Sequence, residues 1–335
     1  MLNDKSILVT GGTGSFGKKF VKTVLDRYSP RRLIVFSRDE MKQFDMAQKT
    51  PHGCMRYFLG DVRDAPRLDT ALEDVDVVIH AAALKQVPAL EYNPIEAIKT
   101  NILGTENVVM AAISKDVERV IVLSTDKAAS PINLYGATKL AADKLTVAAN
   151  NMRGKSSTRL SVVRYGNVIG SRGSVIPHFQ RLVREGAKEI PVTDARMTRF
   201  LITLQQGVDF VLKSLERMQG GELFVPKIPS ATIETIVSAV ADRFPVRLVG
   251  IRPGEKLHEI MCPSEQSCLT LEFEDFYLMK PSITFHQSID YTRTALGDCG
   301  SPVPEGFEYS SLNNPDFVDV ETLRRLIAEA MPFDD

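Results

Sequence analysis

A glycine-rich turn near the N-terminus restricts the fold of this 335-residue chain more than any other feature. The apolar run at residues 6–10 leads directly into Thr10-Gly11-Gly12-Thr13-Gly14-Ser15-Phe16-Gly17, and a helical pattern follows. Glycines at this spacing allow a tight turn, close approach of the backbone to a pyrophosphate, and close helix–strand packing. The free amides at the start of the helix favour phosphate. The predicted dinucleotide site comprises Gly11, Thr13, Gly14, Ser15, Phe16 and Gly17.

Short β-branched runs alternate with helical patterns through the first half of the chain. The runs predicted as strands are residues 6–10, 33–36, 56–59, 77–80, 120–124 and 160–164. Continuous apolar runs of this length are typical of a parallel sheet covered on both faces, and the helices between them imply right-handed crossovers. We predict an α/β fold, a doubly wound parallel Rossmann sheet with a smaller C-terminal substrate-binding lobe.

The pattern changes after Asn167, where a Gly/Ser loop leads into shorter helices and strands. We assign residues 1–170, with about 200–228, to the NADP-binding domain. Residues of about 171–199 and 229–335 are assigned to the substrate-binding lobe, and at least one element is expected to return to the main sheet. The stretch after about Pro263 is weakly patterned, and its role is not predicted.

Composition argues against several classes of partner. The net charge is −1, so no overall field favours nucleic acid or anionic lipid. No apolar run approaches the roughly 20 residues of a membrane span, and the polar start leads into a strand rather than a signal peptide. The four cysteines, Cys54, Cys262, Cys268 and Cys299, lack CxxC spacing. We therefore expect reduced thiols, no metal site and a cytoplasmic enzyme.

The end of the second predicted strand bears on the choice between NAD and NADP. An NAD site usually places a carboxylate there for the ribose hydroxyls, but this chain has Ser37 followed by Arg38, with Lys42 nearby. Cationic side chains suit a 2′-phosphate, so we predict NADP. The alternative uses Asp39 as the ribose acceptor and leaves Arg38 in solvent.

Further cofactor contacts are expected after the third and fourth strands. Asp61 can accept from the adenine amino group, or can serve as a turn or N-cap residue. Val62 can pack on the adenine ring, and the small Ala81 and Ala82 let the backbone approach the cofactor. Lys85 could face the ribose or the substrate, or could lie in solvent.

The fifth predicted strand leads to the candidate catalytic residues. It ends in Ser124-Thr125-Asp126-Lys127, and Tyr135 and Lys139 follow, four residues apart. On a helix this spacing places both side chains on one face. A nearby ammonium favours the phenolate and lowers the tyrosine pKa toward the working range. The Thr125 hydroxyl could bind a substrate oxygen.

Five segments together resemble the extended short-chain dehydrogenase/reductase family: TGGTGSFG, HAAALKQVPALEYNP, LSTDKAASPINLYGATK, VRYGNVIGSRGSVIP and RPGEKLHE. Within it they closely resemble the soluble UDP-N-acetylglucosamine 4,6-dehydratases that invert C5 and begin pseudaminic acid synthesis, for flagellin glycosylation. The resemblance covers roughly residues 1–262. It implies UDP-N-acetylglucosamine as substrate, a tightly bound and recycled NADP, and a homo-oligomer.

The resemblance also implies the roles of the catalytic residues. Asp126 and Lys127 match the acid/base pair of the dTDP-glucose 4,6-dehydratases, with lysine in place of glutamate. Tyr135 takes the 4-hydroxyl proton while C4 gives its hydride to the cofactor. Lys127, if neutral, removes the C5 proton, and Asp126, if protonated, gives a proton to the departing 6-hydroxyl. The hydride returns to C6, and C5 is reprotonated from the other face.

Residues of the later motifs are expected to hold the UDP-sugar by the same resemblance. The guanidinium groups of Arg199 and Arg252 suit the diphosphate, and the Glu255 carboxylate suits ribose hydroxyls. His80 and His258 are expected to be structural. The substrate set is Lys85, Asn167, Val168, Ser174, Arg199, Arg252 and Glu255.

Three classes of function remain open at this point. The first is the inverting dehydratase, and the second is a retaining dehydratase, 4-epimerase or 4-reductase on the same fold. The third is a non-enzymatic NADP sensor, which the intact Thr125, Tyr135 and Lys139 disfavour. Many close relatives carry methionine in place of Tyr135, so its presence favours the soluble inverting group.

Overall fold

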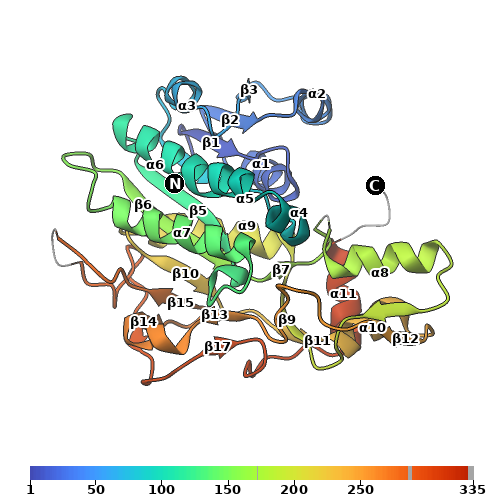
Figure 1. Ribbon diagram of the computed structural model, residues 1–335. Helices are drawn as coiled ribbons and strands as arrows, with labels where there is room; N and C mark the ends of the chain where they lie inside the picture. The colour runs from blue at the N-terminus through green and yellow to red at the C-terminus, as the bar shows by residue number, and fades with distance from the viewer. Residues whose placement is uncertain (172, 286–288, 331–335) are drawn as a thin grey trace.

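A ten-stranded sheet forms the body of the molecule in the computed structural model, which describes residues 1–171, 173–285 and 289–330 (Figure 1). Its order is β16-β14-β15-β10-β6-β5-β4-β1-β2-β3. The six neighbouring strands β6-β5-β4-β1-β2-β3 all pair in parallel, so the predicted α/β class is confirmed. The six predicted strands are β1 (Ser6–Thr10), β2 (Arg32–Ser37), β3 (Met55–Leu59), β4 (Val77–His80), β5 (Arg119–Thr125) and β6 (Arg159–Tyr165).

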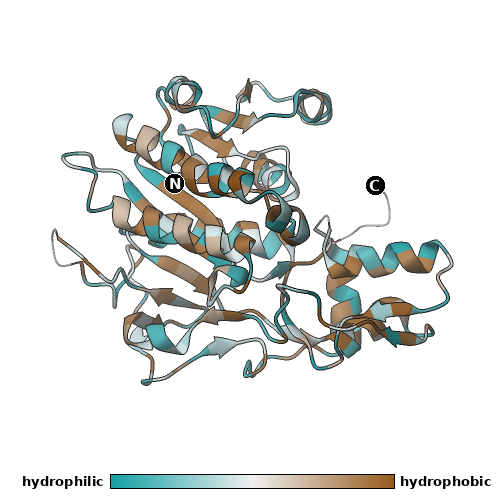
Figure 2. Cartoon of the chain, in the orientation of Figure 1, coloured by the Kyte–Doolittle hydropathy of each residue, from teal (hydrophilic) through white to brown (hydrophobic). Residues whose placement is uncertain are grey.

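The strands are apolar along their length because helices cover both faces of the sheet. Successive side chains of a strand point to opposite faces, so Ile7 and Val9 join one core cluster and Leu8 joins the other. Figure 2 shows the resulting hydrophobic strands between the layers of helices. One face packs against α1 (Ser15–Arg27) and α9 (Leu204–Arg217), and the other against α3 (Ala65–Ala71), α6 (Gly104–Ser114) and α7 (Leu134–Ala149).

The helical segment over residues 94–114 is not one regular helix. The short helices α4 (Val87–Tyr92) and α5 (Pro94–Ala97) precede a π-helical turn, η1 (Ile98–Leu103), which continues into α6. Such turns are frequent at functional sites. Here the turn presents Asn101, whose side chain bonds both the N–H and the C=O of Leu84 and also Thr138. The π turn therefore fixes the loop after β4 against α7.

The second half of the chain returns to the sheet, as predicted. Strand β10 (Leu223–Pro226) pairs in parallel with β6. Three further strands, β15 (Phe276–Met279), β14 (Thr270–Glu272) and β16 (Ser301–Pro302), extend that edge in antiparallel fashion. These three strands lie in the region of about 229–335 that the sequence assigns to the smaller lobe. They are too short to show a strand pattern in the sequence. The exact division into two domains stays a prediction.

The smaller lobe has its own hydrophobic core, which includes Ile176, Phe179, Ile236 and Leu323. It lies beside one end of the sheet, and α11 brings the end of the chain back onto α10 (Figure 1). Around it run β7 (Asn167–Val168), α8 (Val175–Arg184), β8 (Ile190–Val192), β9 (Thr198–Ile202), β11 (Ser230–Thr232), α10 (Ile233–Ala241), β12 (Val246–Leu248) and α11 (Val320–Ala330). The strands β13 (Ile260–Cys262) and β17 (Tyr309–Ser310) instead pack on the core of the main sheet, and η3 (Ser264–Leu269) leads from β13 into β14.

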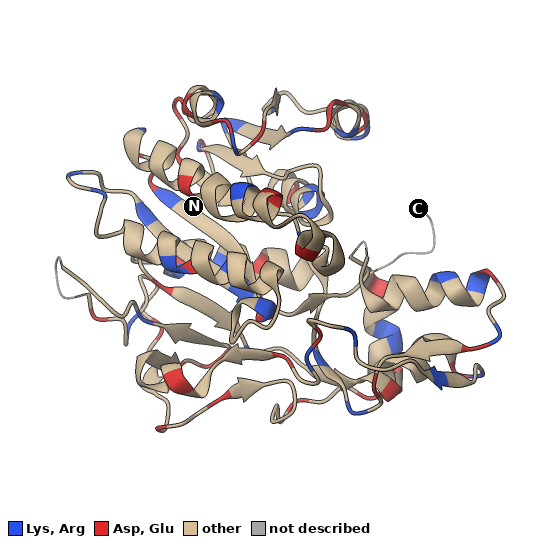
Figure 3. Cartoon of the chain, viewed as in Figure 1, with Lys and Arg blue, Asp and Glu red and all other residues tan. Residues whose placement is uncertain are grey.

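Charged side chains of both signs are interspersed over the elements in Figure 3, in keeping with the near-zero net charge. Within the three described stretches of the chain, no helix has the length and apolar character needed to cross a membrane. Two elements that border the site complete the fold, the helix α2 (Glu40–Lys49) and the 3-10 turn η2 (Asp126–Ala128).

Candidate active site

A cavity of about 1190 Å³ opens at the carboxyl ends of the parallel strands and extends to the smaller lobe. It brings together every predicted site residue except Asp126, from Gly11 to Glu255, which are 244 positions apart in the chain. Its wall includes Gly11, Thr13, Gly14, Ser15, Phe16, Gly17, Ser37, Arg38, Asp39, Lys42, Asp61, Val62, Ala81, Ala82, Lys85, Thr125, Lys127, Tyr135, Lys139, Asn167, Val168, Ser174, Arg199, Arg252 and Glu255.

The glycine turn after β1 has the backbone that a dinucleotide needs. Gly11 has φ 65°, and a Cβ placed on it would lie 2.9 Å from the backbone nitrogen of Ala82. A Cβ on Gly17 would lie 2.4 Å from the Cα of Gly12, so only glycine lets α1 pack so closely on the turn. Helix α1 starts after Gly14, and its first amides face the cavity. The residues present therefore fit the phosphates of a dinucleotide.

The side chains after β2 form an ionic cluster at one end of the cavity. Asp39 accepts the backbone N–H of Lys42 at 2.9 Å and pairs with its ammonium, which lowers the pKa of Asp39. Arg38 lies 3.4 Å from a carboxylate oxygen of Asp61, which also pairs with Arg63. Asp39 thus has two contacts as an N-cap, and Arg38 borders the cavity while its side chain stays 54% exposed.

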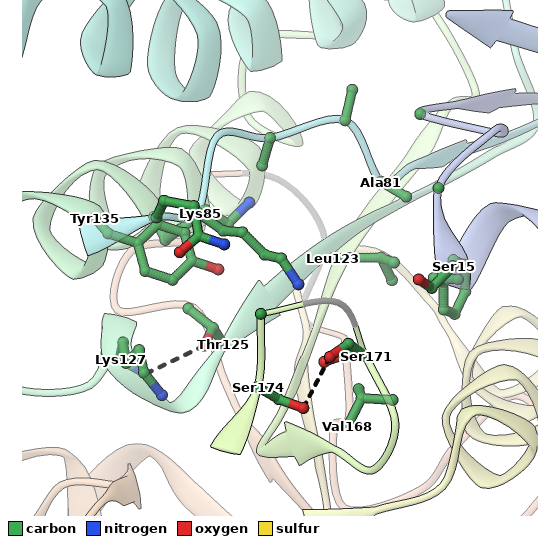
Figure 4. A pocket seen from close by; sticks show the side chains of 18 of the residues that line it. Ser15, Ala81, Lys85, Leu123, Thr125, Lys127, Tyr135, Val168, Ser171 and Ser174 are labelled. Carbon is green, nitrogen blue, oxygen red and sulfur yellow. Dashed lines mark hydrogen bonds between the residues drawn. The ribbon is translucent and has the colours of Figure 1, made fainter. Parts of the chain in front are cut away.

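Helix α7 is placed so that Tyr135 lies over the turn η2. Asn133 caps the helix by accepting the N–H of Gly136 at 2.8 Å. A Cβ on Gly136 would lie 2.0 Å from the carbonyl oxygen of Lys127, so a glycine is required for helix and turn to meet. Figure 4 shows Tyr135, Lys85, Thr125 and Lys127 around the same space.

The state of Tyr135 differs from the expectation. Burial raises the pKa of Tyr135 to about 12, and the attraction of Lys127 with a bond from Thr125 only partly offsets it. Lys139 is buried one turn along the helix, and burial lowers its own pKa against the opposing effect of Asp143. The expected shift of Tyr135 toward the working range by Lys139 is therefore wrong for this state of the protein, because desolvation dominates.

Lys127 is held in a cluster of acceptors. Its Nζ donates to Asp126 Oδ1 at 3.1 Å and to Asn167 Oδ1 at 3.2 Å, and it lies 3.3 Å from Glu259 Oε1. Burial by itself lowers the pKa of Lys127, but the attraction of Asp126 and Glu259 outweighs burial and raises the pKa above its ordinary value. The neutral Lys127 expected from the sequence is thus not the resting state, which is an ammonium.

Asp126 lies behind Lys127 rather than in the wall of the cavity, and it is 0% exposed. Its Oδ1 accepts a hydrogen bond from the Thr125 hydroxyl at 2.9 Å, and that hydroxyl does border the cavity. Its Oδ2 is buried without a hydrogen-bond partner among the described residues. A proton from Asp126 therefore reaches the cavity most directly through Thr125.

The predicted substrate residues have unequal freedom. Arg199 reaches the wall, but its N–H groups donate to the carbonyls of Thr198, Leu257 and Lys256. Its guanidinium therefore supports the backbone at the end of the RPGEK segment. The sequence predicted that this guanidinium would bind the diphosphate of the substrate. Arg252 is largely exposed and lies 4.0 Å from Glu255, so its guanidinium is available to a ligand.

Lys85 and Ser174 both border the cavity, Lys85 from the loop after β4 and Ser174 from the start of α8. Burial, with repulsion from Lys127, lowers the pKa of Lys85. Ser174 donates to the carbonyl of Ser171 at 2.8 Å, as Figure 4 shows. Arg172, which follows Ser171 in this Gly/Ser loop, lies outside the described residues.

The two histidines near the site are structural. His80 is buried between the hydroxyls of Thr10 at 2.7 Å and Thr105 at 3.0 Å, and burial lowers its pKa to about 3. His258 contacts the Thr198 hydroxyl at 2.9 Å.

Two residues of the site were missed by sequence reasoning. Asn133 donates to the carbonyl of Gly254 at 2.8 Å, which ties α7 to the RPGEK segment. Glu259 borders the cavity and contacts Lys127. It closes the RPGEKLHE motif directly before the apolar Ile-Met-Cys run, and a carboxylate at the start of a buried strand was the available signal.

Comparisons with known proteins agree with this geometry. The family described as polysaccharide biosynthesis protein matches residues 7–281. The inverting UDP-N-acetylglucosamine 4,6-dehydratase of Campylobacter jejuni is 56% identical over 98% of both chains. The UDP-glucose 4-epimerase of Rickettsia rickettsii is 45% identical over 83% of both. The X-ray structure of Pen from Bacillus thuringiensis superimposes with a TM-score of 0.88 at 35% identity, covering 98% of each chain.

Proposed function

The chain belongs to the polysaccharide biosynthesis protein family, on the extended short-chain dehydrogenase/reductase fold, and from that membership we propose that it is a UDP-N-acetylglucosamine 4,6-dehydratase that inverts C5. The product is UDP-2-acetamido-2,6-dideoxy-β-L-arabino-hex-4-ulose, and the net reaction is loss of water. The observation that carries the proposal is the ion pair of Asp126 with Lys127, in which Lys127 borders the cavity beside Tyr135 and Asp126 lies behind it, because a plain reductase or epimerase has no use for such a pair.

The chain's glycine turn and the residues after β2 to β4 would hold the nicotinamide nucleotide. When bound and oxidised, that cofactor would supply the acceptor for the hydride of C4 and the donor for C6, so it would be recycled. We assign it as NADP because Arg38 and Lys42 bring two cations to this end of the cavity, where a 2′-phosphate would replace Asp61 and Asp39 as their partners. Nucleotide released by denaturing the purified protein should be the phosphorylated form, and release of NAD alone would contradict the assignment.

The chain's own groups carry the proton transfers. Tyr135 is neutral at rest, so it first gives its own proton to solvent in the cavity, and its phenolate, a strong base, then takes the proton of the 4-hydroxyl. Solvent supplies the proton that C5 later receives on its other face. Lys127 removes the C5 proton, which the 4-ketone has made acidic. Asp126 supplies the proton that leaves with the 6-hydroxyl, passed on by Thr125, whose hydroxyl gives one proton to the sugar and receives one from Asp126.

The UDP-sugar lies along the part of the cavity between Lys85, Asn167 and Arg252. The exposed guanidinium of Arg252 suits the diphosphate, and Glu255 suits ribose hydroxyls. Lys85 supplies a second cation at the sugar end.

We also assign the protein to the cytoplasm, at the first step of pseudaminic acid synthesis for flagellin glycosylation, and to a homo-oligomer. The oligomer is supported by exposed apolar side chains on α4 to α6. Leu103 and Met110 are seven residues apart on one helical face, and Tyr92 and Ile95 lie just before them.

The decisive experiment incubates the purified protein with UDP-N-acetylglucosamine in D₂O without added cofactor and follows the sugar by proton NMR. We expect a 4-keto-6-deoxy product of L-arabino configuration, deuterated at C5. A D-xylo product would contradict inversion only, while an unchanged or C4-epimerised sugar would contradict the dehydratase. The 4-epimerase is the second candidate because of the similarity to the Rickettsia enzyme.

A further inference from the structure

Glu259 is a buried carboxylate in contact with the catalytic lysine. Its side chain is 4% exposed, and its Oε1 lies 3.3 Å from Lys127 Nζ. Its Oε2 is buried and has no hydrogen-bond partner within the described part of the chain. A buried carboxylate with an unsatisfied oxygen costs folding free energy, and such groups persist where function uses them.

The backbone of Glu259 is fixed by the far end of the chain. Its N–H donates to the Ser311 hydroxyl at 2.9 Å, and its carbonyl accepts the N–H of Ser311 at 2.8 Å. Strands β13 and β17 pair directly beside these bonds. The C-terminal stretch, for which the sequence predicted no role, therefore holds this carboxylate under Lys127.

The proton count of the proposed reaction explains why a second carboxylate is needed. At rest, Asp126 and Lys127 form an ion pair at 3.1 Å. Moving one proton from Lys127 to Asp126 produces both the neutral base and the protonated acid, with no change in the net charge of the cluster. While Asp126 holds that proton, it is neutral and cannot serve as the counter-ion of Lys127.

We propose that Glu259 is the permanent counter-ion of Lys127, a positioning residue that keeps the lysine paired when Asp126 is protonated. As Lys127 takes the C5 proton, positive charge develops on its Nζ in a buried site, and the Glu259 carboxylate is the anion that stabilises it. When the Asp126 proton then leaves with the 6-hydroxyl, the resting ion pair is restored. This inference rests on the proposed function.

The test compares Glu259→Gln with Glu259→Asp. Glutamine keeps the volume and removes the charge, so we expect kcat to fall about 10- to 100-fold while KM for UDP-N-acetylglucosamine stays within about 2-fold. Loss of an anion lowers the pKa of Lys127, so the rise of kcat with pH should move to lower pH. Aspartate keeps the charge and should retain several-fold more activity than glutamine. The charged and titratable groups that face Lys127 and are left unchanged are Asp126, Arg199, Lys85, Lys256 and Tyr135.

A matched control is Glu222→Gln, which removes another buried carboxylate, one that accepts from Ser161 and from the amides of Gln219 and Gly220. It should leave the pH profile of kcat unchanged. The proposal is overturned if Glu259→Gln has the wild-type kcat and pH profile, or if the aspartate and glutamine variants lose activity equally. Thermal unfolding of each variant separates loss of fold from loss of catalysis. Wild-type protein that makes no 4-keto-6-deoxy sugar would refute the proposed function itself.

Discussion

At the scale of single residues, the site is governed by competition between desolvation and charge pairing. Both Tyr135 and Lys127 are partly buried, but only the lysine has two carboxylates beside it. Burial therefore keeps the tyrosine neutral, while pairing keeps the lysine charged.

Replacement of Lys127 by alanine tests its role as the C5 base. We expect elimination to fall by about 10²- to 10⁴-fold or more, since a general base of this kind contributes that much. Cofactor content should be unchanged, because the glycine turn and the residues after β2 hold the nucleotide independently. Product formation is measured by NMR and bound nucleotide by chromatography. Retention of wild-type turnover would exclude Lys127 as the base.

His80 makes stability depend on pH. Burial holds its pKa at about 3 in the folded protein, below the value of about 6.5 in an unfolded chain. Between these values the unfolded state binds the extra proton, so stability falls as pH decreases, by up to about 1.4 kcal/mol per pH unit. Urea unfolding at pH 7 and pH 5 should show a smaller loss for His80→Gln than for wild type. An equal loss would contradict this, and the exposed His52→Gln serves as control.

At the scale of elements, the ends and irregularities of helices place the site. The π turn η1 fixes the loop after β4 through Asn101, and the N-cap of α7 reaches the RPGEK segment through Asn133. These contacts hold the loop after β4 and the RPGEK segment in the wall of the cavity. Changes in them should therefore affect the binding of the UDP-sugar more than the rate of the chemical steps.

Asn133→Ala removes both the cap of α7 and the bond to Gly254. Loss of such a cap costs about 1 kcal/mol of stability. We expect KM for the UDP-sugar to rise several-fold, because the segment that carries Arg252 and Glu255 loses its anchor. Thr232→Ala removes the cap of α10 in the same way but away from the cavity. It should cost similar stability without a change in KM, and equal KM effects in both variants would refute the anchoring role.

At the scale of the whole molecule, the sheet and the lobe enclose the cavity, and the face formed by α4 to α6 exposes apolar side chains among charged ones. Leu103 and Met110 are each 44% exposed on that face. We expect the double variant Leu103→Glu and Met110→Glu to weaken self-association, measured by sedimentation velocity. Glutamate at the exposed Ile283 and Phe285, on another part of the surface, is the control. A wild-type monomer, or an unchanged assembly in the double variant, would contradict this interface.

The sequence by itself determined the six parallel strands and the glycine turn, because these depend on local patterns, and the family resemblance supplied the later substrate residues that border the cavity. Strands β1, β2, β4 and β5 are buried along nearly their whole length, and Tyr135 and Lys139 lie one helical turn apart. Only the tertiary structure decided the protonation of Lys127 and the partner Glu259, since that contact spans 132 positions of the chain and depends on burial. The structure of the stretch after about Pro263 also depends on tertiary contacts. Its strands are too short to be recognised alone, and they form because existing sheet edges offer hydrogen-bond partners.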